Sequence, residues 1–299
     1  MAARWNVGVR NGLDVIDVET PASTAAVALH GAQVLSFAPR GDRDWLWVSE
    51  RARWAPGAAL RGGIPLCFPW FGPHPSRPDF PAHGFARTRI WRLEDAREVA
   101  GEVQLRLGLA ADAETLSLFP HGFEARLTVT IGAGLALALA VANLDASPFT
   151  CEVALHSYFA VSDISDLAIE GLAGCDYADK VDGGSPRRQG DGPLRITGEV
   201  DRVYDSGGPV TLIDGGTGRR LRIAGDPAGS TVVWNPAPAK TAKLSDVAPD
   251  AYRRFVCVES GAIAGRRLTV PAGGTAQRSA VLTRFEAGGP RTAAGTPPG

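Results

Sequence analysis

Strict alternation of apolar and polar residues is the main pattern along this chain. In residues 123–131 every second residue is apolar, and residues 103–109 repeat the pattern. Such a period of two predicts β-strands with one buried and one wet face. Residues 135–144 (LALALAVANL) place large apolar side chains on one face and alanines on the other. That strand is therefore expected to be covered on both sides.

Further segments of this kind recur along the whole chain, while no segment keeps a period of 3.6 residues for three turns. Because strands do not alternate with helices, a Rossmann fold or a β/α barrel is excluded. We predict an all-β protein, a large antiparallel β-sandwich. The additional predicted strands are 13–19, 25–29, 33–38, 44–48, 149–156, 167–171, 194–197, 211–214, 220–223, 231–234, 255–260, 268–270 and 276–285.

The chain shows no change of composition, no linker and no internal repeat that would divide it. We therefore predict a single domain over residues 1–286, which is long but within the range of all-β domains. The last residues, 287–299 (AGGPRTAAGTPPG), lack apolar anchors and are expected to be a disordered tail.

Composition narrows the possible partners. The 31 basic and 32 acidic residues give a net charge of −1, without the basic surplus that nucleic-acid or anionic-membrane binding requires. No secretory signal or membrane span is recognisable. The four cysteines form no CxxC pair, which favours reduced buried thiols over a zinc site or disulfides. We expect a cytoplasmic protein.

Four segments depart from the ordinary strand pattern and are candidates for chemistry. His156 points away from the apolar face of its strand, and Glu259 shares a strand face with Phe255 and Cys257. A histidine and a carboxylate form a natural acid–base pair, but each also has a structural alternative, a core histidine and an ion-paired glutamate. Periodicity alone does not bring the two together. The segments are 61–72 (RGGIPLCFPWFG), 81–87 (PAHGFAR), 155–159 (LHSYF) and 255–261 (FVCVESG).

Taken in order, seven motifs resemble the aldose-1-epimerase (galactose mutarotase-like) superfamily, and within it the D-hexose-6-phosphate mutarotases. The resemblance spans nearly the whole chain. The motifs are RGGIP at 61–65, HGFAR at 83–87, LFPHGFE at 118–124, LHSYF at 155–159, DRVY at 201–204, VWNP at 233–236 and FVCVE at 255–259.

The resemblance implies a β-supersandwich with a sugar bound in a cleft on one sheet, and an isomerase that interconverts the α and β anomers of a hexose 6-phosphate. It implies catalytic roles for His156 and Glu259. It implies no cofactor and no metal. We expect a sugar phosphate as partner and a monomeric protein. The implied substrate-binding residues are Arg61, His83, Arg87 and Asp201.

Anomer exchange opens the sugar ring, so one group takes the proton of the C1 hydroxyl while another protonates the ring oxygen. A carboxylate suits the first role and an imidazole the second, which assigns Glu259 as base and His156 as acid. We expect both to face one cleft, with room for a sugar ring between them.

The phosphate of such a substrate needs cations, and guanidinium groups fit phosphate geometry well. Arg61 and Arg87 are the expected pair, placed away from the acid–base pair; alternatively, either arginine braces its loop against a carboxylate such as Asp79. Arg77 is a candidate for an extra contact. Trp70 and Trp234 either stack on the sugar or serve packing.

Three other functions remain open on the sequence. The chain could be a mutarotase for a free aldose such as galactose, a non-catalytic carbohydrate-binding sandwich, or a scaffold without a ligand. The arginines favour a phosphosugar over a free sugar. Retention of His156 and Glu259 favours catalysis over simple binding.

Overall fold

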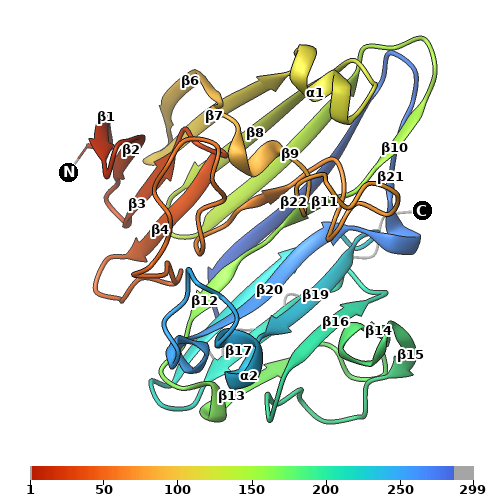
Figure 1. Cartoon of the computed structure of the whole chain (residues 1–299). Coiled ribbons are helices and arrows are strands. Elements are labelled where there is room, and N and C mark those ends of the chain that lie inside the picture. The colour runs from red at the N-terminus through yellow and green to blue at the C-terminus, as the bar shows by residue number, and fades with distance from the viewer. Residues whose placement is uncertain (1, 286–299) are drawn as a thin grey trace, which may run out of the picture.

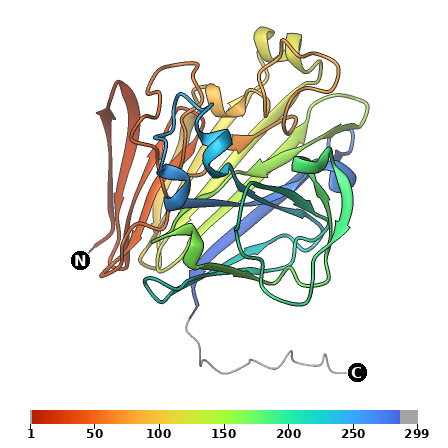
Figure 2. The same cartoon turned by 60° about the horizontal axis from the view of Figure 1, so that its bottom comes forward.

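The computed structural model describes residues 2–285, so the predicted tail at 287–299 lies outside the described residues. The alternating segments form antiparallel strands, and the prediction of an all-β fold is confirmed. Two eight-stranded sheets contain most of the strand residues, and a four-stranded sheet built from the N-terminus lies at the left in both views (Figures 1 and 2). Within residues 2–285, no helix is long and apolar enough to cross a membrane.

The first eight-stranded sheet contains the longest uninterrupted strands, and we call it the long-strand sheet. Its strand order is β13-β17-β18-β22-β9-β8-β7-β6. Along β8 buried and more exposed residues alternate as predicted from the sequence. Its strands are β6 (Arg92–Val99), β7 (Glu102–Ala110), β8 (Phe123–Ile131), β9 (Leu135–Asn143), β13 (Leu167–Glu170), β17 (Val210–Asp214), β18 (Arg219–Gly225) and β22 (Thr275–Arg284).

The second eight-stranded sheet is built from shorter pieces, and we call it the short-strand sheet. Its order is β15-β14-β16-β19-β20-β11-β5, and β12 also pairs with β20. Its strands are β5 (Leu66–Cys67), β11 (Val153–Leu155), β12 (Tyr158–Ala160), β14 (Asp176–Asp179), β15 (Ser185–Arg188), β16 (Val200–Tyr204), β19 (Ser230–Asn235) and β20 (Phe255–Ala262).

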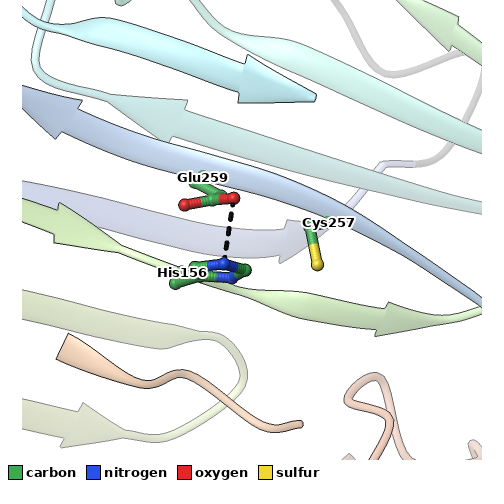
Figure 3. A group of neighbouring side chains, drawn as sticks. All are labelled: His156, Cys257 and Glu259. Carbon is green, nitrogen blue, oxygen red and sulfur yellow. Dashed lines mark ion pairs between the residues drawn. The ribbon is translucent and has the colours of Figure 1, made fainter. Parts of the chain in front are cut away.

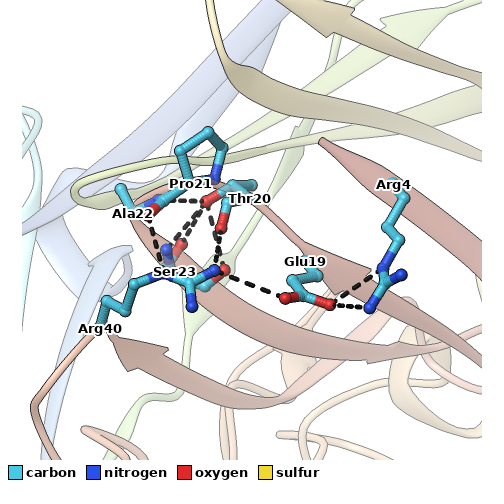
Figure 4. Close-up of polar contacts among 7 residues, drawn as sticks. All are labelled: Arg4, Glu19, Thr20, Pro21, Ala22, Ser23 and Arg40. Atoms are coloured by element: carbon cyan, nitrogen blue, oxygen red, sulfur yellow. Dashed lines mark hydrogen bonds and ion pairs between the residues drawn. The ribbon is translucent and has the colours of Figure 1, made fainter. Parts of the chain in front are cut away.

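Polar contacts join the strands of the N-terminal sheet (Figure 4). The carboxylate of Glu19 accepts hydrogen bonds from Arg4 and Arg40. At the turn that follows, the hydroxyl of Thr20 accepts the amide of Ser23 at 2.9 Å, which closes the connection between two strands. The sheet order is β1 (Arg4–Arg10), β2 (Leu13–Glu19), β3 (Ser23–Ala28) and β4 (Gln33–Pro39), and a separate two-stranded ladder pairs β10 (Phe149–Cys151) with β21 (Leu268–Val270).

The main hydrophobic core is shared by both eight-stranded sheets. Leu127 and Leu137 of the long-strand sheet lie in one cluster with Val233, Val256 and Val258 of the short-strand sheet. The opposite face of the short-strand sheet carries the intervening residues of the same strands. The alternation therefore directs one set of side chains into the core and places the other set on the opposite face of the short-strand sheet.

Helices are few and short. α1 (Ala113–Leu118) begins at Asp112, whose carboxylate accepts the amide of Thr115 while the Thr115 hydroxyl accepts the amide of Asp112. This reciprocal cap stabilises a helix start. The other helical elements are α2 (Ala237–Thr241) and the 3-10 turns η1 (Ala86–Thr88), η2 (Ile164–Asp166), η3 (Lys180–Asp182), η4 (Ala251–Arg254) and η5 (Ala264–Arg266).

Three predicted strands differ from the structure. Residues 44–48 form isolated bridges, because the amides of Trp45 and Trp47 bond to two different strands. Residues 194–197 contribute one bridge, at Leu194. The predicted strand 149–156 is broken into β10 and β11 at Glu152, whose amide donates to Pro69 and whose carboxylate accepts the amides of neighbouring loops.

Candidate active site

The two predicted catalytic residues lie opposite each other on adjacent strands. β11 and β12 both pair with β20, and the residues between them lie at a gap in the ladder. The register pairs Leu155 with Ser260 and Tyr158 with Cys257, which places His156 across from Glu259. Directly opposed residues of antiparallel strands point to the same face of a sheet. Both side chains therefore point to the same face of the short-strand sheet, as a shared cleft requires.

His156 and Glu259 are in direct contact. His156 Nε2 lies 3.3 Å from Glu259 Oε1, and the two side chains are 8% and 1% exposed (Figure 3). The expectation that a sugar ring fits between them is wrong, since cross-strand neighbours approach too closely for a ring to enter. A substrate must lie across the pair instead. His156 Nδ1 and Glu259 Oε2 are buried without a hydrogen-bond partner.

Burial controls the protonation of this pair. It raises the pKa of the Glu259 carboxyl well above its usual value, and the charge of Asp201 raises that pKa further. It lowers the pKa of the His156 imidazole well below its usual value, as do the nearby His83 and Arg87. Both shifts favour the uncharged forms of the pair, a neutral imidazole on His156 and a neutral carboxyl that carries the shared proton on Glu259.

Tyr158 supports the histidine from one side. Its ring stacks on the His156 ring, with centroids 4.9 Å apart and planes 10° apart. Its hydroxyl accepts a hydrogen bond from Arg61 Nη1 at 3.1 Å. Arg61 is itself held by Asp246, whose carboxylate accepts Nε at 3.0 Å and Nη2 at 3.3 Å. Asp246 and Tyr158 were not singled out by the sequence, although Tyr158 lies inside the LHSYF motif.

The segment after Arg61 contains glycine because its backbone packs directly against another segment. Gly62 has φ +114°, and a Cβ there would lie 2.4 Å from the carbonyl oxygen of Trp47. Only glycine allows this close approach of two backbones. The segment is thereby fixed against the sheet, and Arg61 enters the site from a rigid base.

His83 reaches the site from the second loop. Its backbone is in the left-handed region, φ 65°, which is uncommon for a residue with a side chain and frequent at functional sites. Its Nδ1 accepts the amide of Gly72 at 3.3 Å, which leaves the proton on Nε2. Burial, and after it the charges of Arg87 and Lys180, lower the pKa of His83 to about 3. His83 is therefore a neutral hydrogen-bond donor. The centroids of the His83 and His156 rings are 5.5 Å apart.

Asp201 lies two strands away from Glu259 on the same face. It is opposite Trp234 of β19, which in turn is opposite Cys257 of β20. Burial raises the pKa of Asp201, while the charges of Lys180 and Lys240 lower it. The Trp234 ring packs against Phe255 and lies edge-on to His156, so Asp201 and Trp234 border the acid–base pair.

Arg87 completes the set of predicted site residues. Its Nη2 donates to the carbonyl of Ala82 at 2.8 Å, and its buried Nε has no partner. Its charge acts on His156, Glu259 and His83. Among residues 2–285, Arg87 forms no ion pair with a carboxylate.

The remaining sequence candidates have structural partners. Arg77 forms an exposed ion pair with Asp79 and lies over the Phe80 ring. Asp79 therefore braces neither Arg61 nor Arg87. Trp70 is buried among Phe80 and Phe85 and donates to a backbone carbonyl, which is a packing role. The histidines outside the site bond locally: His30 to the Ala58 carbonyl, His74 to the amides of Ser76 and Arg77, and His121 to Asp145.

One group of side chains has the donor types that zinc accepts. Donor atoms of His156, Cys257 and Glu259 lie within 4.8 Å of one another (Figure 3). Burial, and after it the charge of Glu259, raises the pKa of the Cys257 thiol well above its usual value, which opposes the thiolate that a metal needs. An ion here would also bind both members of the acid–base pair.

Comparison with known proteins identifies relatives along most of the chain. The family model described as Aldose 1-epimerase matches residues 14–282. A protein of Escherichia coli (strain K12) is 36% identical over 249 residues, 83% of each chain, and carries the name "Putative glucose-6-phosphate 1-epimerase". A protein of Cenchrus ciliaris with the same name is 32% identical, over 80% of this chain and 75% of its own.

Solved structures share the fold. A Salmonella typhimurium protein described as "a putative mutarotase (YeaD)" is 30% identical, with a TM-score of 0.88 over 95% of this chain and 94% of its own. A galactose mutarotase-like protein of Clostridium acetobutylicum is 13% identical, with a TM-score of 0.76 over 96% of this chain and 99% of its own. The second likeness concerns the fold alone.

Proposed function

The chain belongs to the aldose 1-epimerase family and is an isomerase of that type, and we propose that it interconverts the α and β anomers of a hexose 6-phosphate, with glucose 6-phosphate the expected substrate. The observation that carries the proposal is the contact between His156 and Glu259. Two groups that share one proton within hydrogen-bond reach fit a reaction that removes one proton and returns another.

Proton balance gives each residue its role. In the reacting state Glu259 is a carboxylate and His156 an imidazolium, which together hold the same single proton as the free protein. Glu259 takes the proton of the C1 hydroxyl while His156 protonates the ring oxygen, and the C1–O5 bond breaks to give the open aldehyde. The pair then consists of a neutral carboxyl and a neutral imidazole.

Burial favours the state reached on ring opening. Since it disfavours both charges, the neutral pair that accompanies the open aldehyde is the arrangement the surroundings stabilise. The charges of Lys180 and Arg87 act in the other direction and favour the Glu259 carboxylate. Rotation about C1–C2 presents the other face of the aldehyde, and reversal of the two proton transfers closes the ring as the other anomer.

Anomer exchange measured by magnetisation-transfer NMR tests the proposal on glucose 6-phosphate, glucose and galactose. We expect the protein to accelerate exchange of the phosphosugar most. Faster exchange of free galactose or glucose than of glucose 6-phosphate would indicate a free-sugar mutarotase. Acceleration of none of the three, by a protein that binds them, would contradict the catalytic proposal.

A further inference from the structure

One cation near the site was not singled out by the sequence. Lysine is rare here, with three residues in 299, at positions 180, 240 and 243. Lys240 is bound by Glu199 at 2.8 Å, and Lys243 is exposed. Lys180, at the start of η3, forms no ion pair with any of the residues 2–285. Its charge is therefore not neutralised by a neighbouring carboxylate of the described chain.

The Lys180 ammonium lies beside the loop that holds His83. Its Nζ is 4.8 Å from the centre of the Phe71 ring and 3.7 Å from where a Cβ at Gly72 would lie. The Phe71 ring contacts the His83 ring edge-on, with centroids 4.8 Å apart. The His83 ring in turn neighbours the His156 ring, with centroids 5.5 Å apart. The charge of Lys180 also acts on His83, Asp201 and Glu259, so the ammonium belongs to the surroundings of the acid–base pair.

Lys240 is ion-paired with Glu199 and with Asp201. The other three cations around the site, Arg61, Arg87 and Lys180, differ in the groups that already bind them. Two nitrogens of Arg61 donate to Asp246 and a third to Tyr158, so its charge and most of its donors are used. Arg87 bonds to a carbonyl, and its Nε has no partner. Arg87 and Lys180 therefore keep uncompensated charge, whereas Arg61 does not.

We infer that Lys180 and Arg87 together bind the phosphate of the substrate, and that Arg61 is a positioning residue that holds Tyr158 beneath His156. This inference rests on the proposed function. A phosphate monoester carries about −1.5 to −2 charges at neutral pH, which two cations balance. Arg87 supplies a planar fork of donors and Lys180 a mobile point charge. The expected pair of Arg61 and Arg87 is replaced by one that leaves the Asp246 ion pair intact.

The test compares the substitutions Lys180→Ala, Lys180→Arg and Lys243→Ala. Loss of one charge-assisted contact lowers kcat/KM for glucose 6-phosphate by about 10- to 100-fold, mainly through KM. The ratio of phosphosugar to free-sugar exchange falls by the same factor. Lys180→Arg restores most of the loss because it keeps the charge. Lys243→Ala, which removes an exposed lysine, leaves the ratio unchanged.

Two further measurements separate this inference from the function it rests on. Inorganic phosphate should inhibit the wild-type protein competitively, and its inhibition constant should rise by a similar factor in Lys180→Ala. Arg61→Ala should slow exchange of phosphorylated and free glucose equally. A wild-type protein that does not exchange glucose 6-phosphate overturns the proposed function. An active wild type with an unchanged ratio in Lys180→Ala, or a selective phosphosugar loss in Arg61→Ala, overturns the inference alone.

Discussion

The two eight-stranded sheets share a core but differ in the length of their strands and in the continuity of their hydrogen-bond ladders. In the long-strand sheet, β8 and β9 each run for nine residues with regular alternation and a continuous ladder. In the short-strand sheet, β11 and β12 are three residues each, and the gap between them holds His156. The long-strand sheet buries mainly apolar side chains, and its buried polar atoms without partners are the Nε atoms of Arg220 and Arg278. In the short-strand sheet such atoms belong to His156 and Glu259, the acid–base pair itself.

The long-strand sheet therefore contributes mainly to the stability of the protein, whereas the short-strand sheet holds the reactive groups. A buried polar atom without a partner costs folding free energy, roughly 1–3 kcal/mol. The same atom is available to a substrate. The regular sheet offsets such costs through its apolar contacts, so the site can keep groups whose pKa values are far from ordinary. Three predictions examine the separation, from the largest expected effect to the smallest.

Removal of either catalytic group should abolish most activity without unfolding the protein. We expect Glu259→Gln and His156→Ala each to slow anomer exchange of a hexose 6-phosphate by about 10²- to 10⁴-fold, the usual contribution of one positioned acid or base. His121→Ala is the matched control, since that histidine bonds to Asp145 outside the site. Near-normal exchange in a folded Glu259→Gln protein would contradict the assignment.

A substitution in the core of the long-strand sheet should have the opposite effect, a loss of stability without a loss of activity. Leu127 is fully buried in the shared core. Leu127→Ala should lower the free energy of unfolding by ~2–5 kcal/mol, measured by urea titration, because it leaves a cavity. Below its melting temperature the variant should keep its exchange rate. Thr128→Ala, which changes the neighbouring residue on the other face, should alter stability by no more than about 0.5 kcal/mol. A loss of rate that exceeds the unfolded fraction would show that the two sheets are coupled.

The smallest effect concerns the pH dependence of stability. Burial raises the pKa of Glu259, so the folded protein keeps a proton that the unfolded chain releases above its ordinary pKa of 4.5. The stability contribution of Glu259 is therefore fully present below that pH and is lost as the pH rises. Glu259→Gln removes this titration. The variant should gain stability relative to the wild type as the pH rises above about 4.5, as followed by thermal unfolding; a difference that stays constant with pH would contradict the raised pKa.

The regular sheet was predictable from sequence, whereas much of the site was not. The strand at 123–131 has the predicted bounds because its burial follows one local period. The strand predicted at 149–156 breaks at Glu152 because loops distant in the sequence bond to that residue. Alternation carries no information about such partners.

The same reason applies to the residues around the catalytic pair. His156 and Glu259 were identified through motifs, yet their 3.3 Å contact depends on strand register. Lys180 lies in a segment of mixed charge (DYADKVDGG) whose sequence does not indicate a site, whereas the fold brings it beside Phe71 and lets its charge act on His83 and Glu259. α1 was missed because six residues are too few for a helical period, although its cap, Asp112 with Thr115, was visible in the sequence.

The interrupted ladder opposite β20 also constrains how this enzyme can diverge. β11 and β12 pair with the two ends of one strand, so the number of residues between them is set by the length of that strand. One inserted or deleted residue would shift the following side chains by one position and turn them to the other face. His156 and Glu259 would then no longer meet. Length changes among active descendants should therefore accumulate in outer loops such as 72–80 and be absent between Val153 and Tyr158.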